Sequence, residues 1–174
     1  MSTREFKQLI YKRDYIMRIC TSYFYQIRNF KRNMIPISTA IYDPAWYHDF
    51  MKDNSYIFKD KRNIINGIRI ESIIEQGKKS NHGPEICPCK NKDCNTCSFL
   101  TNYKKNLENI NFDNMIVDMQ KLANNYKEKE KIKEEIILVL IVYETPNNPC
   151  SERKSLQEYF INHGWECKEL EYPI

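Results

Sequence analysis

The chain has 174 residues and a mass of 21.0 kDa, the size of one domain that buries roughly 70% of its unfolded surface. Hydrophobic residues make up 41% and charged residues 29%, with only four glycines, so collagen-like, low-complexity and wholly disordered classes are excluded. The net charge is +4, and it is concentrated near the N-terminus: residues 1–35 hold eight Lys or Arg and two acidic residues, a net charge of +6.

The sequence predicts a protein without an export signal or a membrane span. Residues 1–15 are charged throughout and lack the apolar segment of a signal peptide. The longest apolar run, residues 136–142, has seven residues, far fewer than the roughly 20 that cross a bilayer. We therefore expect a cytoplasmic protein that does not bind a membrane.

The first half of the chain predicts two strands followed by an insertion. Residues 14–20 predict a strand that ends at a Thr21-Ser22 turn, and residues 23–30 have helical spacing. Residues 34–40 predict a second strand, and Pro44 with the aromatic residues after it predicts a loop. Residues 55–59 and 64–73 predict a β-hairpin, and residues 77–97 predict an irregular loop. Residues 51–97 are therefore interpreted as a hairpin and a cysteine-rich loop inserted into one domain, residues 1–174.

The second half alternates helices and strands. Residues 99–110 and 112–133 predict helices, the second capped by Asn111 or Asp113. Residues 136–143 are apolar without alternation, which indicates a strand covered on both faces. Residues 149–161 predict a helix that stops near Gly164, and residues 165–172 a final strand. This order predicts an open, mostly parallel α/β sheet with helices on both faces.

Ligands of such sheets bind beyond the carboxyl ends of the strands, and the residues there are the candidate site. Arg69 is a candidate for binding an anion, or alternatively pairs with a carboxylate such as Glu71. Trp46 or Tyr47 is a candidate for stacking on a base; alternatively, Trp46 covers the core. The other candidate ligand-binding residues follow the first two strands: Thr21, Ser22, Tyr23, Ser38 and Thr39.

The loop after the third strand carries the candidate catalytic residues. Glu144 and Cys150 have the side chains that would take part in a reaction. Arg153 together with a helix N-terminus would lower the pKa of the Cys150 thiol. The alternative is a capping turn in which Cys150 packs on the sheet. No histidine lies nearby in sequence to act as its base.

Several strings resemble an uncharacterised family catalogued as domain of unknown function four-eight-eight. They are Ile19-Cys20-Thr21-Ser22-Tyr23-Phe24, Ile37-Ser38 followed by Pro44-Ala45-Trp46-Tyr47, and Leu138 to Pro146 followed by Cys150 and Arg153. The resemblance covers both ends of the chain and implies a Rossmann-like fold, with no activity established for the family. Where the family has Cys-His-Arg, this chain has one more residue and places Glu152 before the arginine.

Four of the seven cysteines form a cluster, Cys87, Cys89, Cys94 and Cys97. Four thiolates satisfy a tetrahedral Zn²⁺, and the C-x₂-C half is the usual form of such a site. The C-x-C half is less usual, so a disulfide or redox pair and unliganded thiols remain alternatives, and the spacing does not distinguish zinc from an iron–sulfur cluster. Cys20 and Cys167 lie in predicted strands and are interpreted as packing residues.

Two functions from different classes are consistent with these patterns. The first is an α/β protein that binds a nucleotide or another small phosphate-bearing ligand at the carboxyl ends of the strands, with structural zinc in the insertion. The second is a non-catalytic module, encoded by a mobile element or phage, that binds nucleic acid or a protein through its basic N-terminal region. The sequence determines neither the reaction, if there is one, nor the oligomeric state.

Overall fold

The computed structural model describes residues 17–53, 69–80 and 97–173. Its four strands are β1 (Met17–Tyr23), β2 (Met34–Ser38), β3 (Ile136–Val142) and β4 (Cys167–Glu169). The helices are the 3₁₀ helix η1 (Phe24–Asn29), α2 (Ala45–Asp53), α3 (Glu71–Ser80), α4 (Ser98–Leu107), α5 (Phe112–Lys129) and α6 (Arg153–Asn162).

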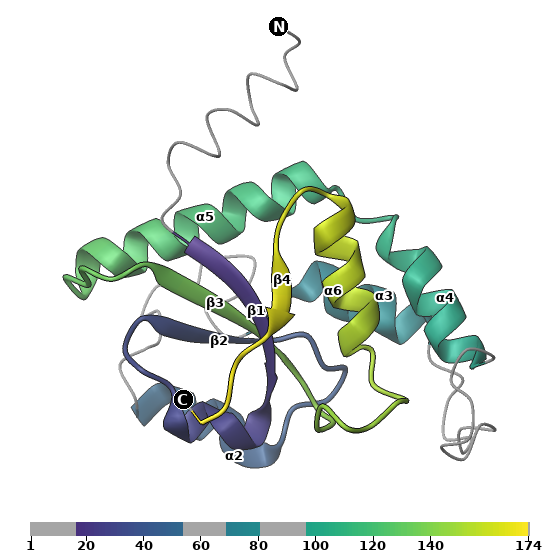
Figure 1. Cartoon of the computed structure of the whole chain (residues 1–174), viewed down its shortest axis with the longest axis horizontal. Helices are drawn as coiled ribbons and strands as arrows, with labels where there is room; N and C mark the ends of the chain where they lie inside the picture. The colour runs from purple at the N-terminus through teal and green to yellow at the C-terminus, as the bar shows by residue number, and fades with distance from the viewer. Residues whose placement is uncertain (1–16, 54–68, 81–96, 174) are drawn as a thin grey trace, which may run out of the picture.

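The strands form one sheet in the order β2-β3-β1-β4, and every neighbouring pair is parallel. β3 lies inside the sheet and all seven of its residues are buried, which confirms the prediction from its continuous apolar run. Figure 1 shows the strands side by side, with α2 at the end of the molecule where the C-terminus lies. The predicted open α/β sheet is therefore confirmed.

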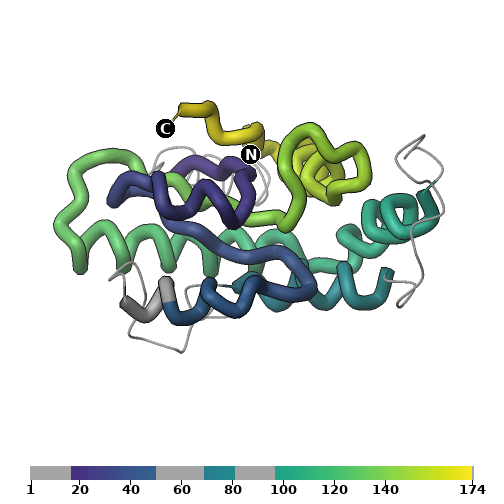
Figure 2. The backbone as a smooth tube through the Cα atoms, turned by 90° about the horizontal axis from the view of Figure 1, so that it is seen from below, coloured from purple at the N-terminus to yellow at the C-terminus, as the bar shows by residue number. Residues whose placement is uncertain are grey.

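Helices cover both faces of the sheet. On one face, Val139 and Ile141 pack with Phe24 and Ile27 of η1 and with Tyr47 of α2. On the other face, the alternate residues of β3 pack with apolar residues of α3, α4, α5 and α6. Figure 2 shows α3, α4 and α6 gathered at one end of the molecule, with α5 reaching toward the other.

The ends of three predicted elements are corrected by the structure. β1 continues through Thr21, Ser22 and Tyr23, because the β-branched Thr21 fits the pleated strand and no glycine or proline stops it. A short 3₁₀ helix follows instead of the predicted helix. At the other end of the chain, α6 begins at Arg153, four residues after Pro149, and the final strand has only three residues, Cys167–Glu169.

Two segments predicted to be loop or strand are helical. Pro44 predicts a loop, but proline also favours the start of a helix, and α2 begins at the next residue. Helix α3 includes residues 71–73 of the predicted hairpin and residues 77–80 of the predicted loop. Its buried positions Ile73, Ile74 and Gly77, together with Ile70 directly before the helix, have helical spacing, which the other isoleucines before them in the sequence conceal. Arg69, also placed in the predicted hairpin, instead forms a parallel β-bridge with Ser38 at the end of β2. Residues 55–59 and 64–68 of the predicted hairpin and residues 81–96 of the predicted loop lie outside the described residues.

Candidate functional site

The carboxyl ends of β1 and β3 mark the point where the chain leaves the sheet in opposite directions. The two strands are neighbours, but the chain leaves β1 toward β2 on one side and leaves β3 toward β4 on the other. Such a switch point is where open parallel sheets bind ligands. Phe24 and Tyr143, the first residues after the two strands, meet there with ring centroids 5.8 Å apart. The switch point is therefore lined by aromatic side chains.

A hydrogen-bonded network joins the ends of β1 and β4. Glu169 of β4 accepts a 2.8 Å bond from Oγ1 of Thr21 on one carboxylate oxygen and a 2.8 Å bond from the Tyr172 hydroxyl on the other. Nε2 of Gln157 donates to Oγ1 of Thr21 at 2.7 Å, and the hydroxyls of Ser22 and Tyr172 lie 2.6 Å apart. Burial raises the pKa of Tyr172 well above its ordinary value. Thr21 and Ser22, predicted to bind ligand, are buried and serve this network.

Arg153 is also committed to contacts within the protein. Its side chain is 7% exposed, and Nε lies 2.6 Å from Oε2 of Glu169, close but without hydrogen-bond alignment. Nη2 donates to the backbone carbonyl of Glu144 at 2.8 Å, and the guanidinium lies 6.0 Å from the ring of Tyr23. Arg153 therefore ties the loop after β3 to β4, and its charge is already balanced by a carboxylate.

Glu144 and Glu152 form a carboxyl pair beneath this loop. Burial, and then the negative charge of Glu144, raise the pKa of Glu152 to about 8, against an opposing effect of Arg153. Oε2 of Glu144 is buried with no hydrogen-bond partner in the described structure. The buried hydroxyl of Tyr103 on α4 also lacks a partner there, and burial and the two carboxylates raise its pKa. The raised pKa of Glu152 indicates that this carboxyl keeps its proton near neutral pH, which limits its repulsion with Glu144.

Ser38, at the end of β2, belongs to a second polar cluster, centred on Asp43. The Asp43 side chain is 2% exposed; it accepts hydrogen bonds from Ser38 Oγ and Arg69 Nη1, and it contacts Nε2 of His48 at 3.0 Å. Arg69 Nε also lies 3.3 Å from Glu71, which confirms the alternative prediction for this arginine. Because Ser38 donates to the aspartate and not to the histidine, this cluster is not a nucleophilic triad.

The remaining predicted ligand-binding residues differ in exposure. Thr39 is buried and donates to the carbonyl of Ile141 at 2.9 Å. Tyr47 is fully buried and is therefore unavailable for stacking on a ligand. Trp46 is 41% exposed, with edge-to-face contacts to Phe24 and Tyr47. Among the predicted stacking residues, Trp46 is thus the one with an accessible ring.

The cysteines fall into different environments. Cys150 is half-buried in the turn before α6, where its backbone N–H donates to Oδ1 of Asn148 at 2.9 Å. Cys97 is a buried free thiol at the residue before α4; the other three cysteines of the cluster lie outside the described residues. Cys20 and Cys167 are buried, as predicted for packing residues, and burial raises the pKa of Cys167 to about 12.

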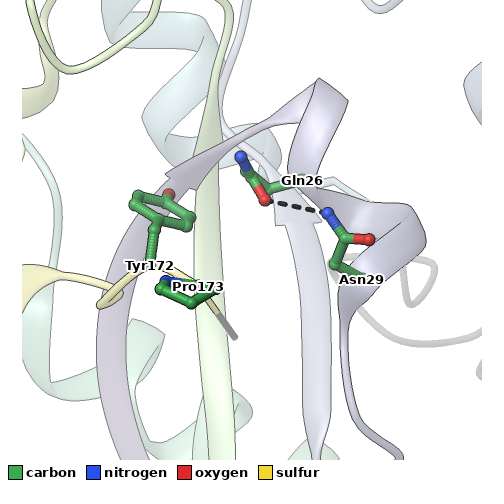
Figure 3. Close-up of a pocket in the computed structure, with 4 residues that line it drawn as sticks. All are labelled: Gln26, Asn29, Tyr172 and Pro173. Atoms are coloured by element: carbon green, nitrogen blue, oxygen red, sulfur yellow. Dashed lines mark hydrogen bonds between the residues drawn. The ribbon is translucent and has the colours of Figure 1, made fainter.

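An open hollow of about 570 Å³ lies beside the network, lined by Gln26 and Asn29 of η1 and by Tyr172 and Pro173 (Figure 3). Nδ2 of Asn29 donates to Oε1 of Gln26 at 3.0 Å, and Nε2 of Gln26 donates to the Tyr23 hydroxyl at 3.0 Å. The lining by described residues therefore combines two carboxamides with an aromatic ring and a proline, and none of these four side chains is charged.

The 3₁₀ geometry of η1 explains why its amides face the hollow. Such a helix has three residues per turn, so residues three apart lie in one row. The first row, Phe24 and Ile27, is buried in the core. The second row is Tyr25 and Arg28, whose guanidinium lies 4.7 Å from the Tyr25 ring centre, and the third is Gln26 and Asn29. We call the second and third rows the η1 surface.

Sequence reasoning missed Gln26, Asn29, Tyr172 and Glu169 as site residues. The three-residue spacing of the two amides was a usable signal, but it has meaning only once η1 is known to be a 3₁₀ helix. Glu169 was missed because its role depends on the pairing of β4 with β1, in which it lies opposite Thr21.

Within the described residues, no group of three or more His, Cys, Asp or Glu side chains is arranged to hold a metal ion. The same residues contain no helix with both the length and the apolar composition needed to cross a bilayer. In comparisons with known proteins, no family model, no curated protein and no solved structure matches the chain. The resemblance stated from the sequence motifs therefore stays a prediction.

Proposed function

We propose that the protein binds the nucleoside part of a nucleotide in the hollow between η1 and Tyr172. The observation that carries this proposal is the lining itself: two carboxamides, a phenol ring and a proline, without a charged side chain. A nucleoside is an uncharged polar group with a flat ring, and its base has hydrogen-bonding edges. The location, beside the carboxyl ends of β1 and β4, agrees with where parallel sheets bind ligands.

Asn29 supplies the hydrogen bonds to the base. After donating one amide hydrogen to Gln26, it retains a second amide hydrogen and its carbonyl oxygen. A donor and an acceptor on one carboxamide match paired groups on the edge of a base, as in the contacts of Asn and Gln with adenine. Tyr172 offers an aromatic surface, and its hydroxyl is held in place by Ser22 and Glu169.

The phosphate of the ligand has to be bound outside the buried network. Arg153 is paired with Glu169, and Arg69 is paired with Asp43 and Glu71, so neither offers an unbalanced positive charge. Arg28 is exposed, lies on the row beside the amides and is our candidate for the phosphate contact.

We propose no reaction for the predicted catalytic residues. Oε2 of Glu144 is buried, and Arg153 is paired with Glu169. Cys150 lies three residues before the first residue of α6, so the predicted effect of a helix N-terminus on its thiol has little support. We therefore propose a binding function.

The zinc site is a separate part of the proposal. We propose that Cys87, Cys89, Cys94 and Cys97 hold one structural Zn²⁺, supported by the number of thiols and the C-x₂-C spacing. The ion would fix the segment that leads into α4, because Cys97 is the residue directly before that helix.

The test of nucleotide binding is a calorimetric titration of the protein with nucleosides, nucleoside monophosphates and inorganic phosphate. Replacing Asn29 with alanine is expected to weaken nucleoside binding about tenfold or more, since up to two hydrogen bonds of roughly 1 kcal/mol each are lost. The matched control is Asn125→Ala, an exposed asparagine on α5. The proposal is wrong if no nucleoside or nucleotide binds, or if the two variants bind equally well.

A further inference from the structure

The η1 surface and the aromatic side chains of the switch point extend beyond one nucleoside. Resting on the function proposed above, we propose that the partner of this surface is a single-stranded nucleic acid. A mononucleotide needs one base contact and one phosphate contact. A single strand repeats both, and proteins bind it with several exposed aromatic rings beside positive charges.

Arg28 differs from the other arginines that the structure describes. Each of the other four lies within ion-pair distance of a carboxylate; the pairs are Arg18 with Glu135, Arg32 with Glu130, Arg69 with Asp43 and Glu71, and Arg153 with Glu169. Arg28 has no carboxylate partner in the described part of the chain; instead it stacks on the exposed ring of Tyr25. A guanidinium that lies over a ring and has no carboxylate partner among the described residues is suited to bind a phosphate oxygen.

Exposed rings occur near the same strand ends. Tyr25 is 61% exposed and Tyr143 is 59% exposed, and Trp46 is also accessible. Trp46 and Tyr143 both contact Phe24, the residue directly before Tyr25, with their rings edge to face. The rings are thus arranged around the N-terminal end of η1, and the amides of Gln26 and Asn29 follow along the same helix. Unpaired bases stack on such rings, whereas a duplex keeps its bases stacked on one another.

The charge distribution agrees with a polyanionic partner. Residues 1–35, which contain η1, carry a net charge of +6, whereas the remainder of the chain carries −2. Lys31, two residues after η1, is exposed as well. An acidic protein would also be attracted by this charge, but it offers few flat rings to an aromatic surface, so the combination favours nucleic acid.

The experiment measures binding of fluorescein-labelled single strands of about 4 to 16 nucleotides, the range of site sizes known for such surfaces, by anisotropy at several salt concentrations. Oligo(dT) and a mixed RNA sequence are the probes, and a duplex of matched length is the control. The variants are Arg28→Gln and Tyr25→Ala, with Arg32→Gln as the matched control, since Arg32 is exposed, lies close to η1 and is paired with Glu130.

We expect single strands to bind more tightly than mononucleotides and duplex. Arg28→Gln should weaken this binding about three- to tenfold and reduce the salt dependence by roughly one phosphate contact. Tyr25→Ala should weaken it about fivefold or more through lost stacking. Arg32→Gln should leave the affinity within about twofold of the unmodified protein, because this charge is already balanced.

Four results would overturn the inference. If nucleosides bind but single strands bind no more tightly than they do, the inference is refuted and the proposed function stands. If neither nucleosides nor single strands bind, the proposed function is refuted too. Equal loss with Arg28→Gln and Arg32→Gln would show a diffuse charge effect and no defined contact. If single strands bind but neither Arg28→Gln nor Tyr25→Ala weakens that binding, the nucleic acid binds another surface of the protein. The partner of the η1 surface would then be a protein.

Discussion

Replacing Glu152 with glutamine is expected to remove most of a pH dependence of stability. The carboxyl of Glu152 lies against Glu144, and its pKa is about 8 in the folded protein, compared with 4.5 for an unperturbed glutamate. Between these two pH values the folded protein holds a proton that the unfolded chain has released. The free energy of unfolding therefore falls as pH rises through this window, and it levels off above about pH 8.

The magnitude follows from the size of the pKa shift. Each unit of pKa difference corresponds to about 1.4 kcal/mol, so the whole shift amounts to at most about 5 kcal/mol. Between about pH 5.5 and 7.5 the unmodified protein should lose up to about 3 kcal/mol that Glu152→Gln does not lose. Glutamine preserves the size of the side chain and a hydrogen-bond donor for Glu144.

Urea denaturation at several pH values, followed by tryptophan fluorescence, measures this difference. Trp165 is 9% exposed, so its emission should report unfolding. Glu166→Gln, an exposed glutamate, controls for the loss of one carboxylate. If the unmodified protein and Glu152→Gln give parallel curves of stability against pH, the two carboxyls do not share a proton and the reasoning is refuted.

Arg153→Met should destabilise the protein by about 3 to 5 kcal/mol, because it leaves Glu169 charged and partly buried without its partner; the double variant Arg153→Met, Glu169→Gln, which removes the charge but keeps an acceptor oxygen at residue 169, should recover much of this loss in urea denaturation. A single variant that costs under about 1 kcal/mol would show that the pair contributes little. Elemental analysis should find one zinc ion per chain in the purified protein, and Cys89→Ser with Cys94→Ser should remove it. A protein without metal and with all thiols free would exclude the zinc proposal.

Much of the fold follows from patterns that are local in the sequence. The run over β3 predicts a strand buried on both faces because it has no polar alternation. Asn111 caps α5 as predicted, accepting a 3.1 Å bond from the backbone N–H of Asn114. By contrast, Thr21 and Ser22 do not mark the end of β1, since nothing local distinguishes a polar strand residue from a turn. Pairing with β3 holds both residues in the strand, and Thr21 also pairs with β4 on the other side.

The candidate site was less predictable because it depends on partners far apart in the sequence. The sequence shows the positive charges of Arg69 and Arg153, but it does not show which carboxylates pair with them. Glu71 could be predicted as a neighbour of Arg69, whereas Asp43 is 26 positions away. Glu152 was noted only as a departure from a motif, and its contact with Glu144 depends on how the loop after β3 folds.

The short 3₁₀ helix after β1 limits how this region can change its length. Each of its three rows has a different environment: one in the core, one with the arginine and one at the hollow. Removing one residue before Ile27 would turn the following residues by about one third of a turn, which would bring the charged Arg28 to the buried position of Ile27 and turn Ile27 toward the hollow. The segment should therefore accept substitutions in its two exposed rows far more readily than any insertion or deletion.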